Sequence, residues 1–425
     1  MERARITLRP KEDLRLRAGH PWVYDNEIAR VEGQPAPGDE VEIRDARGLP
    51  VGVAFFNPSS KIRARIYSRE PREADKAFFV EAITRALDYR KRWFDPARQS
   101  LRAIYGEADG LPGLIVDSFV GVPDSSPPPE TAAGASPLPS RGAALPDIAD
   151  AGRWLSVQLL SLGMARRKDL IVSALGEVLP AAGIAERSDA PVRGLEGLEP
   201  ETGVLAGKVP RRILIAENSL SFGVDLLGGQ KTGWFLDQRS NRAAAARYAE
   251  GRRVLDAFCN AGGFGLACAA AGAESVLAVD SSQEAVAEVS ANAARNGLGD
   301  CVKAVAANAF DYIRGLERTK ERFGLVVLDP PAFAKNRASI EGAHRGYKDL
   351  NLRALKLLEK GGILVTCSCS HWFDRERFSS MLEEAAADSG RRLRILEERS
   401  QDLDHPIVSG YGESRYLKCV IAEAF

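Results

Sequence analysis

The sequence predicts an α/β fold, with a parallel, doubly wound sheet in the C-terminal half behind a small β domain and a central α+β domain. Two observations support this expectation. From residue 230 onward, short apolar runs alternate with helical patterns, as strands and crossover helices do in a parallel sheet. Residues 1–70 instead hold short β-like runs separated by turn signals, which predicts a small β domain.

The composition is that of a globular protein, with 45% hydrophobic and 27% charged residues. The 58 basic and 58 acidic residues cancel, so the net charge neither supports nor excludes a nucleic-acid partner. No apolar run reaches the roughly 18 residues of a membrane helix, and the N-terminus lacks an apolar signal core. We therefore expect a cytoplasmic protein. Its six cysteines, without zinc-binding spacing, predict neither disulfides nor a metal site.

The central domain, expected over residues 71–229, begins with a connecting helix over 73–93, where apolar residues recur at three- and four-residue spacing. Strand-like runs and one further helix, near 166–179, follow. The stretch 121–152 holds seven of the 23 prolines and is predicted to be a flexible insertion. The third domain is expected over 230–425.

A strand that runs into a loop of small residues opens the third domain. The loop residues predicted to line a cofactor are Phe258, Asn260, Ala261, Gly262 and Gly263. Asp280 closes the next strand, 24 residues after Asp256, where a carboxylate can bind the ribose hydroxyls of an adenosine-containing cofactor. The alternative is that Asp280 caps a helix.

The cofactor is predicted to be S-adenosylmethionine. A dinucleotide site needs the spacing Gly-x-Gly-x-x-Gly for its pyrophosphate, and the loop lacks it. S-adenosylmethionine has no phosphate and carries a sulfonium cation, which polar and acidic groups suit better.

Two further strands end in polar residues. Asp329 follows an apolar strand and precedes two prolines, a sequence moderately specific for methyltransferases that act on planar bases. Another strand ends in a run containing Cys367 and Cys369. A thiolate there could add to carbon-6 of cytosine and make carbon-5 nucleophilic, with Asp329 as the acid near ring nitrogen-3. Cys367 is more simply a buried small residue.

Several motifs together resemble one family, the PUA-domain class I methyltransferases of bacterial large-subunit ribosomal RNA, close to the 23S cytosine-5 enzyme. They lie at residues 19–24, 52–58, 230–239, 329–331, 346–349, 368–370 and 404–406. The resemblance implies an N-terminal PUA β-barrel for RNA binding, a central α+β domain and a C-terminal Rossmann-like methyltransferase domain. It implies that Cys369 is the nucleophile and that Gln238 lies near the cofactor. It also makes a homodimer plausible.

Two departures from the family pattern concern the cofactor site and the central domain. Asn308 stands where the family has an acidic residue near the adenine, and an amide can still bind an adenine edge. The 121–152 insertion is not part of the pattern. Arg345 and Lys348, just after the Asp-Pro-Pro loop, are predicted to meet RNA phosphates, with plain surface solvation as the alternative.

Three functions remain open at this point. The leading one is cytosine-5 methylation of ribosomal RNA through a covalent cysteine adduct. The second is methylation of a guanine or adenine nitrogen, which needs no covalent catalysis. The third is a non-catalytic RNA-binding assembly factor with a vestigial cofactor pocket.

Overall fold

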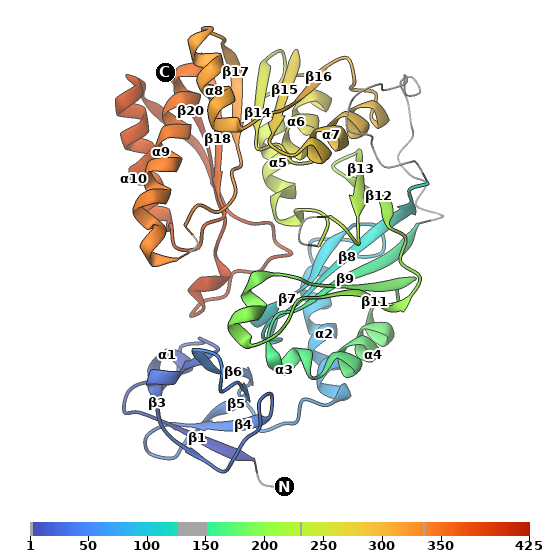
Figure 1. Ribbon diagram of the computed structural model, residues 1–425, viewed down its shortest axis with the longest axis vertical. Coiled ribbons are helices and arrows are strands. Elements are labelled where there is room, and N and C mark those ends of the chain that lie inside the picture. Colours follow the sequence, from blue (N-terminus) through green and yellow to red (C-terminus); the bar gives the residue numbers. More distant parts are fainter. Residues whose placement is uncertain (1–2, 126–150, 230–231, 335) are drawn as a thin grey trace.

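A computed structural model describes residues 3–125, 151–229, 232–334 and 336–425, and arranges them around three β-sheets that follow one another along the chain (Figure 1). Most of the predicted insertion, residues 126–150, lies outside the described residues, as do residues 230 and 231 of the 230–239 motif. No helix in the described ranges is both long and apolar enough to span a membrane.

The first sheet has six strands in the order β2-β6-β5-β4-β1-β3. Its strands are β1 Ala4–Leu8, β2 Trp22–Tyr24, β3 Ile28–Glu32, β4 Glu40–Arg44, β5 Pro50–Phe56 and β6 Ile62–Ser68, with helix α1 at Asp13–Arg17. Alternate side chains of β4 point inward, so Val41 and Ile43 are buried while their neighbours stay partly exposed. The early basic residues are largely neutralised, for example Arg3 by Glu40 at 2.9 Å.

The second sheet forms the central unit, in the order β11-β10-β9-β8-β12-β13, with β7 paired to β8. Its strands are β7 Leu101–Tyr105, β8 Leu114–Pro123, β9 Gly152–Leu159, β10 Gly183–Ser188, β11 Glu201–Gly207, β12 Arg212–Glu217 and β13 Leu220–Asp225. Its helices are α2 Lys76–Arg90, α3 Leu162–Ala165 and α4 Lys168–Val178. Short 3-10 turns lie at Asp25–Glu27, Gly106–Asp109, Pro191–Glu196, Leu236–Gln238, Arg337–Ser339 and Gly412–Ser414.

Three expectations for this unit need correction. Helix α2 ends at Arg90, so Trp93, expected on its apolar face, lies beyond the helix and is 56% exposed. The predicted second helix is α4, but the one-turn helix α3 precedes it. The limits of the predicted insertion are wrong, because Gly121 and Gly152 pair with each other in the antiparallel ladder of β8 and β9.

The third sheet has the order β16-β15-β14-β17-β18-β20-β19. Its strands are β14 Arg253–Ala257, β15 Ser275–Asp280, β16 Val302–Ala306, β17 Phe323–Leu328, β18 Leu358–Ser368, β19 Leu393–Arg399 and β20 Lys418–Ala424. The first five are parallel, as predicted, whereas β20 pairs antiparallel with both β18 and β19. Strand order reverses at β14, and ligands of such sheets bind where the carboxyl ends diverge.

Helices cover both faces of the third sheet (Figure 1). They are α5 Arg239–Ala246, α6 Gly263–Ala270, α7 Gln283–Arg295, α8 Ala309–Arg318, α9 Ile340–Leu357 and α10 Arg375–Ser389. Side chains of α8, α9 and α10 share one buried cluster with the strands, and those of α5 and α6 share another. Residues of α6 and α7 also pack with β12 and β13, which joins the second and third sheets through an apolar core.

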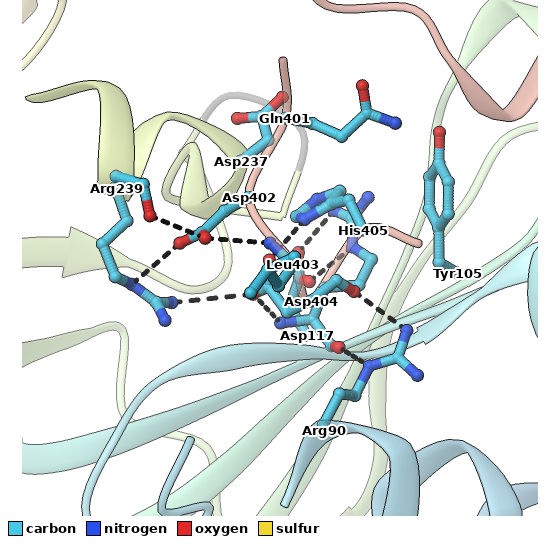
Figure 2. A network of polar contacts seen from close by, with 12 residues as sticks. Arg90, Tyr105, Asp117, Asp237, Arg239, Gln401, Asp402, Leu403, Asp404 and His405 are labelled. Carbon is cyan, nitrogen blue, oxygen red and sulfur yellow. Dashed lines mark hydrogen bonds and ion pairs between the residues drawn. The ribbon is translucent and has the colours of Figure 1, made fainter. Parts of the chain in front are cut away.

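A buried ionic network forms a second joint between these sheets (Figure 2). Asp404, in the segment between β19 and β20, accepts hydrogen bonds from the Arg102 backbone N–H at 2.8 Å and from His405 at 2.7 Å. The guanidinium of Arg90, itself paired with Asp109, donates to the Asp404 carbonyl at 2.9 Å. Burial alone would raise the pKa of Asp404, but the neighbouring His405 and Arg239 outweigh burial and hold this pKa at about 2. We call this group the Asp404 network.

Candidate active site

The loop after β14 has an unusual backbone. Phe258 and Asn260 adopt φ angles of 64° and 47°, in the left-handed region that side chains other than glycine rarely enter. The backbone N–H groups of Phe258 and Cys259 both donate to the Val279 carbonyl, which holds the loop against β15. Gly262, with φ 85°, is the N-cap residue that precedes α6. Strain of this kind is typical of a ligand-binding loop.

The predicted glycines lie where no side chain fits. A Cβ at Gly262 would come 2.3 Å from a methyl group of Leu266, and one at Gly263 would come 2.5 Å from Nε of Arg242. Ala261 lies between the strained Asn260 and these glycines. Side chains of the protein itself therefore occupy the space beside both glycines, and α6 can start here only because these two residues lack a Cβ.

Asp280 connects the end of β15 to this loop. Its carboxylate accepts hydrogen bonds from the backbone N–H of Asn260 and of Ser282, each at 3.0 Å. The side chain that caps α7 belongs to Ser282, which accepts from Ala285, so the alternative role of Asp280 as a helix cap is wrong.

A third carboxylate, Asp256 in β14, was not predicted as a site residue. It is buried, and its Oδ2 accepts from the Gly265 backbone at 2.8 Å. Burial first, and then the charges of Asp329 and Asp280, raise the pKa of Asp256 to about 7. We call Asp256, Asp280 and Asp329 the carboxylate cluster. Together they create a negative potential at the strand ends, which suits a cationic ligand.

Gln238 and Asp329, 91 residues apart in the chain, meet at this edge. The Gln238 amide donates to the Asp329 carboxylate at 3.0 Å and accepts from Asn241 at 2.6 Å. Gln238 is buried and Asp329 is half-buried at the end of β17. Gln238, which the family resemblance places near the cofactor, thus contacts Asp329, a second residue predicted for the site.

Asn308 has a structural task. Its side-chain oxygen accepts hydrogen bonds from the backbone N–H of Phe310 at 3.0 Å and Asp311 at 3.3 Å, so it caps the N-terminus of α8. The Phe310 ring lies between Phe258 and Phe333, with centroid distances of 6.0 and 5.9 Å. The expected contact between Asn308 and an adenine edge stays a prediction.

The Ser-Cys-Ser sequence at the end of β18 is held by its two serines. Both Ser368 and Ser370 hydrogen-bond to the Tyr347 hydroxyl, at 2.9 and 2.8 Å. Ser370 also accepts from the backbone N–H of Ala334, which ties this turn to the Asp-Pro-Pro loop at 3.1 Å. Tyr347, part of the 346–349 motif, therefore holds the serine side chains on either side of Cys369.

The cysteines differ in access. Cys367 is fully buried opposite Cys419, and its hydrogen bond to Cys419, followed by burial, raises the pKa of its thiol well above the usual value. Cys259 and Cys268 are buried as well. Two cysteines are partly exposed: Cys301, at the amino edge of the third sheet before β16, and Cys369, at the carboxyl edge.

Arg345 and Lys348 lie on α9, outside the carboxylate cluster. Lys348 forms ion pairs with Glu384 at 3.0 Å and Asp388 at 2.9 Å on α10. Arg345 is exposed and forms no ion pair in the described parts of the chain. Lys348 therefore has acidic partners on its own surface, whereas the charge of Arg345 faces solvent.

Comparison with known families defines the class of this protein. Residues 6–69 match the PUA-like domain, and residues 200–410 match the S-adenosylmethionine-dependent methyltransferase. The fold is shared with a putative SAM-dependent methyltransferase from Streptococcus mutans, at 19% identity and a TM-score of 0.79, with 99% of each chain covered. A putative methyltransferase complexed with SAH has the same TM-score at 20% identity, and the match covers 100% of both chains. The chain is thus an S-adenosylmethionine-dependent methyltransferase with an N-terminal PUA-like domain.

Curated relatives narrow the class to one family. The ribosomal RNA large subunit methyltransferase I of Alteromonas mediterranea is 37% identical over 423 residues, covering 99% of this chain and 98% of the relative. The protein of the same name from Photobacterium profundum is 38% identical over 410 residues, with 95% of both chains covered. The chain belongs to the ribosomal RNA large subunit methyltransferase I family.

Proposed function

We propose that this protein methylates carbon-5 of a cytosine in large-subunit (23S) ribosomal RNA through a covalent adduct with Cys369. The observation that carries the proposal is the position of Cys369, a partly exposed thiol at the carboxyl edge of the third sheet. Its turn is hydrogen-bonded to the Asp-Pro-Pro loop through Ser370 and Ala334. Ribosomal RNA as the substrate class is supported by the names of the full-length relatives.

The residues at the edge fit S-adenosylmethionine. Its sulfonium and ammonium groups suit the negative potential of the carboxylate cluster, and the strained loop after β14 lies directly beside Asp280. The residues proposed to hold it are Gln238, Phe258, Asn260, Ala261, Gly262, Gly263, Asp280, Asn308 and Asp329.

The cofactor, when bound, supplies a methyl group made electrophilic by its positive sulfur. In the proposed reaction the Cys369 thiolate forms a bond to carbon-6, and the electrons of the C5–C6 double bond make carbon-5 nucleophilic. Asp329 donates a proton to ring nitrogen-3 in this step. After carbon-5 has taken the methyl group, a base removes its proton. The restored C5–C6 double bond then expels the thiolate, and nitrogen-3 returns its proton to Asp329.

The target cytosine must leave its stack to reach Cys369, so the proposed substrate is single-stranded or flipped out. The PUA-like domain and the exposed Arg345 are proposed to bind the RNA backbone, and Lys348 to assist after leaving its acidic partners. Replacing Arg345 with Ala should reduce the slope of log affinity against log salt concentration by about 1.

Trapping of the adduct tests the covalent route. RNA that carries 5-fluorocytosine at the target cannot lose a proton from carbon-5, so a cysteine adduct should accumulate with wild-type protein. Cys369→Ala should form no adduct and transfer no methyl group. Cys301→Ala, which removes the other partly exposed thiol, should behave as wild type. Full methylation by Cys369→Ala would rule out the adduct and favour a nitrogen target.

Nucleoside mass spectrometry tests the substrate. Large-subunit ribosomal RNA from a strain that lacks the gene should be short of one 5-methylcytidine, and the wild-type gene should restore it. Loss of a methylated purine instead would identify the nitrogen chemistry. An unchanged set of methylated nucleosides, together with no S-adenosylmethionine binding by calorimetry, would favour the non-catalytic assembly factor.

A further inference from the structure

Lys418 is a buried lysine next to the Ser-Cys-Ser turn. It opens β20 opposite Ser368 of β18 and is 6% exposed. Its ammonium donates to the Ser370 carbonyl at 2.6 Å and to the Tyr416 carbonyl at 2.8 Å. In the part of the chain that the structure describes, no carboxylate forms an ion pair with it. A buried ammonium with only neutral partners is costly, so a nearby anion would stabilise it.

The charged and titratable groups around this ammonium identify that anion. Burial lowers the pKa of Lys418 to about 8, and Cys369 and Asp374 act in the opposite direction, while Arg375 adds to the lowering. Asp374 is engaged elsewhere, because it caps α10 through the Arg377 backbone at 2.9 Å and pairs with the Arg377 guanidinium.

Arg375 and Tyr347 complete these surroundings. Arg375 pairs with Glu398 at 3.2 Å. Tyr347, on α9, faces the turn with its hydroxyl held by the two serines, and burial is the first cause that raises its pKa. Neither can serve as the counter-anion, which leaves the Cys369 thiolate.

We propose that Lys418 is a positioning residue that holds Cys369 ready for attack, because its ammonium fixes the Ser370 carbonyl and places a positive charge beside the thiolate. The inference rests on the nucleophile assigned under the proposed function. The thiol proton leaves to solvent, and the ammonium keeps its own three protons. A lysine suits this task because it is a compact point charge that fits beneath a single turn.

Alkylation of Cys369 tests this role without RNA. The rate of its reaction with iodoacetamide, measured by mass spectrometry of the Cys369 peptide between pH 6 and pH 10, gives the midpoint of thiol ionisation. Lys418→Met removes the charge, Lys418→Gln keeps a donor for the Ser370 carbonyl without the charge, and Lys418→Arg keeps the charge. Lys303→Met, at an exposed position of β16 on the far edge of the sheet, is the matched control.

We expect the midpoint to rise by about one pH unit in Lys418→Met and Lys418→Gln, so that alkylation at pH 7.5 slows about tenfold. Lys303→Met should follow the wild type, and Lys418→Arg, which keeps the charge on a bulkier group, should have a midpoint below those of both uncharged variants. Methylation by Lys418→Gln should recover at high pH, which a purely structural defect would not do. S-adenosylmethionine binding by calorimetry shows that each variant is folded.

Two results would overturn the inference: unchanged midpoints in both uncharged variants, or a wild-type midpoint above the roughly 8.5 of an ordinary thiol. The wild-type measurement decides the case even if the uncharged variants do not fold. Failure of the proposed function has a different signature, namely methylation by Cys369→Ala. If Lys418→Met and Lys418→Gln keep the wild-type midpoint while Cys369→Ala is inactive, the role of Lys418 is excluded and the proposed function stands.

Discussion

The carboxylate cluster and the Asp404 network are built from the same kind of side chain and reach opposite electrostatic states. In the network, Asp404 is buried among Arg90, Arg239 and His405, and its pKa falls to about 2. In the cluster, Asp256 is equally buried, yet its strongest charged neighbours are acids and its pKa rises to about 7.

The difference separates a structural site from a ligand site. A network whose negative charges are compensated by the protein needs no ligand to balance them, and it stabilises the joint between two sheets. A cluster whose charges repel one another is stabilised by a cation from outside. Under the proposed function S-adenosylmethionine is that cation, and its binding is then expected to stabilise the cluster.

The largest effect is expected when Asp404 is removed from the Asp404 network, in which the negative charges are compensated. Asp404→Ala leaves the Arg102 backbone N–H without its partner and leaves Asp402, at 3.9 Å, as the acidic neighbour of the buried Arg239 guanidinium. The free energy of unfolding should fall by about 3–5 kcal/mol, as for other broken buried ion pairs. Urea unfolding at pH 7.5 measures it. A loss below about 1 kcal/mol would mean that this network behaves like a surface ion pair.

The next largest effect is that Asp256 and Asp404 should contribute to the free energy of unfolding with opposite dependences on pH. The folded pKa of Asp256, about 7, lies above that of an unfolded aspartate, so its contribution to stability is present at low pH and is lost as pH rises toward 7. Relative to Asp256→Asn, the wild type should lose about 1.4 kcal/mol per pH unit between pH 4 and pH 7. Urea unfolding of the ligand-free proteins across this range measures the slope.

Asp404 provides the contrast in sign. Its folded pKa lies below the unfolded value, so its contribution is present above about pH 4 and is lost as pH falls toward 2. Relative to Asp404→Asn, the wild type should therefore lose stability in the acid range and change little between pH 5 and pH 7. Equal slopes for the two aspartates would contradict the comparison.

A smaller effect concerns the ligand itself. Asp280→Asn keeps the shape of the side chain and removes one negative charge from the cluster. The dissociation constant for S-adenosylmethionine should rise about tenfold, equivalent to about 1.4 kcal/mol. Titration calorimetry measures it, with the exposed Asp300→Asn as the control. An unchanged affinity would exclude Asp280 from the cofactor site.

The smallest effect is expected at the surface. Lys348→Met removes two ion pairs that lie in water, with Glu384 and Asp388, and exposed pairs of this kind contribute little. The melting temperature should not change measurably. A fall of several degrees would show that compensation matters at exposed sites as much as in the Asp404 network.

The parts of the site that lie at strand ends could be predicted from the sequence, because an apolar run that stops at an acid is a local pattern. Asp280 and Asp329 were found in this way. The Gln238–Asp329 contact joins residues 91 positions apart and was not predicted; the family resemblance implied only that Gln238 lies near the cofactor. Asp256 looks like any strand residue until burial and its acidic neighbours are known.

Other features depend on strand register or on the exact end of a helix. Lys418 lies beside Cys369 because β20 runs antiparallel to β18, and the sequence offered no sign of that pairing. The boundary between α3 and α4 falls at Arg166 and Arg167, where neither glycine nor proline marks a break. Trp93 continues the apolar spacing of α2 in sequence but lies past its last turn.

The Asp404 network also bears on how the chain is made. Arg90 and Asp404 are separated by 314 residues, so during synthesis the central sheet emerges long before the aspartate that joins its network. Domains generally fold in the order in which they leave the ribosome, and contacts between distant residues form late. Until the last strands are released, a nascent central unit therefore carries Arg90 and Arg102 without Asp404, and premature termination near the 3′ end of the message would yield a product that cannot close this joint.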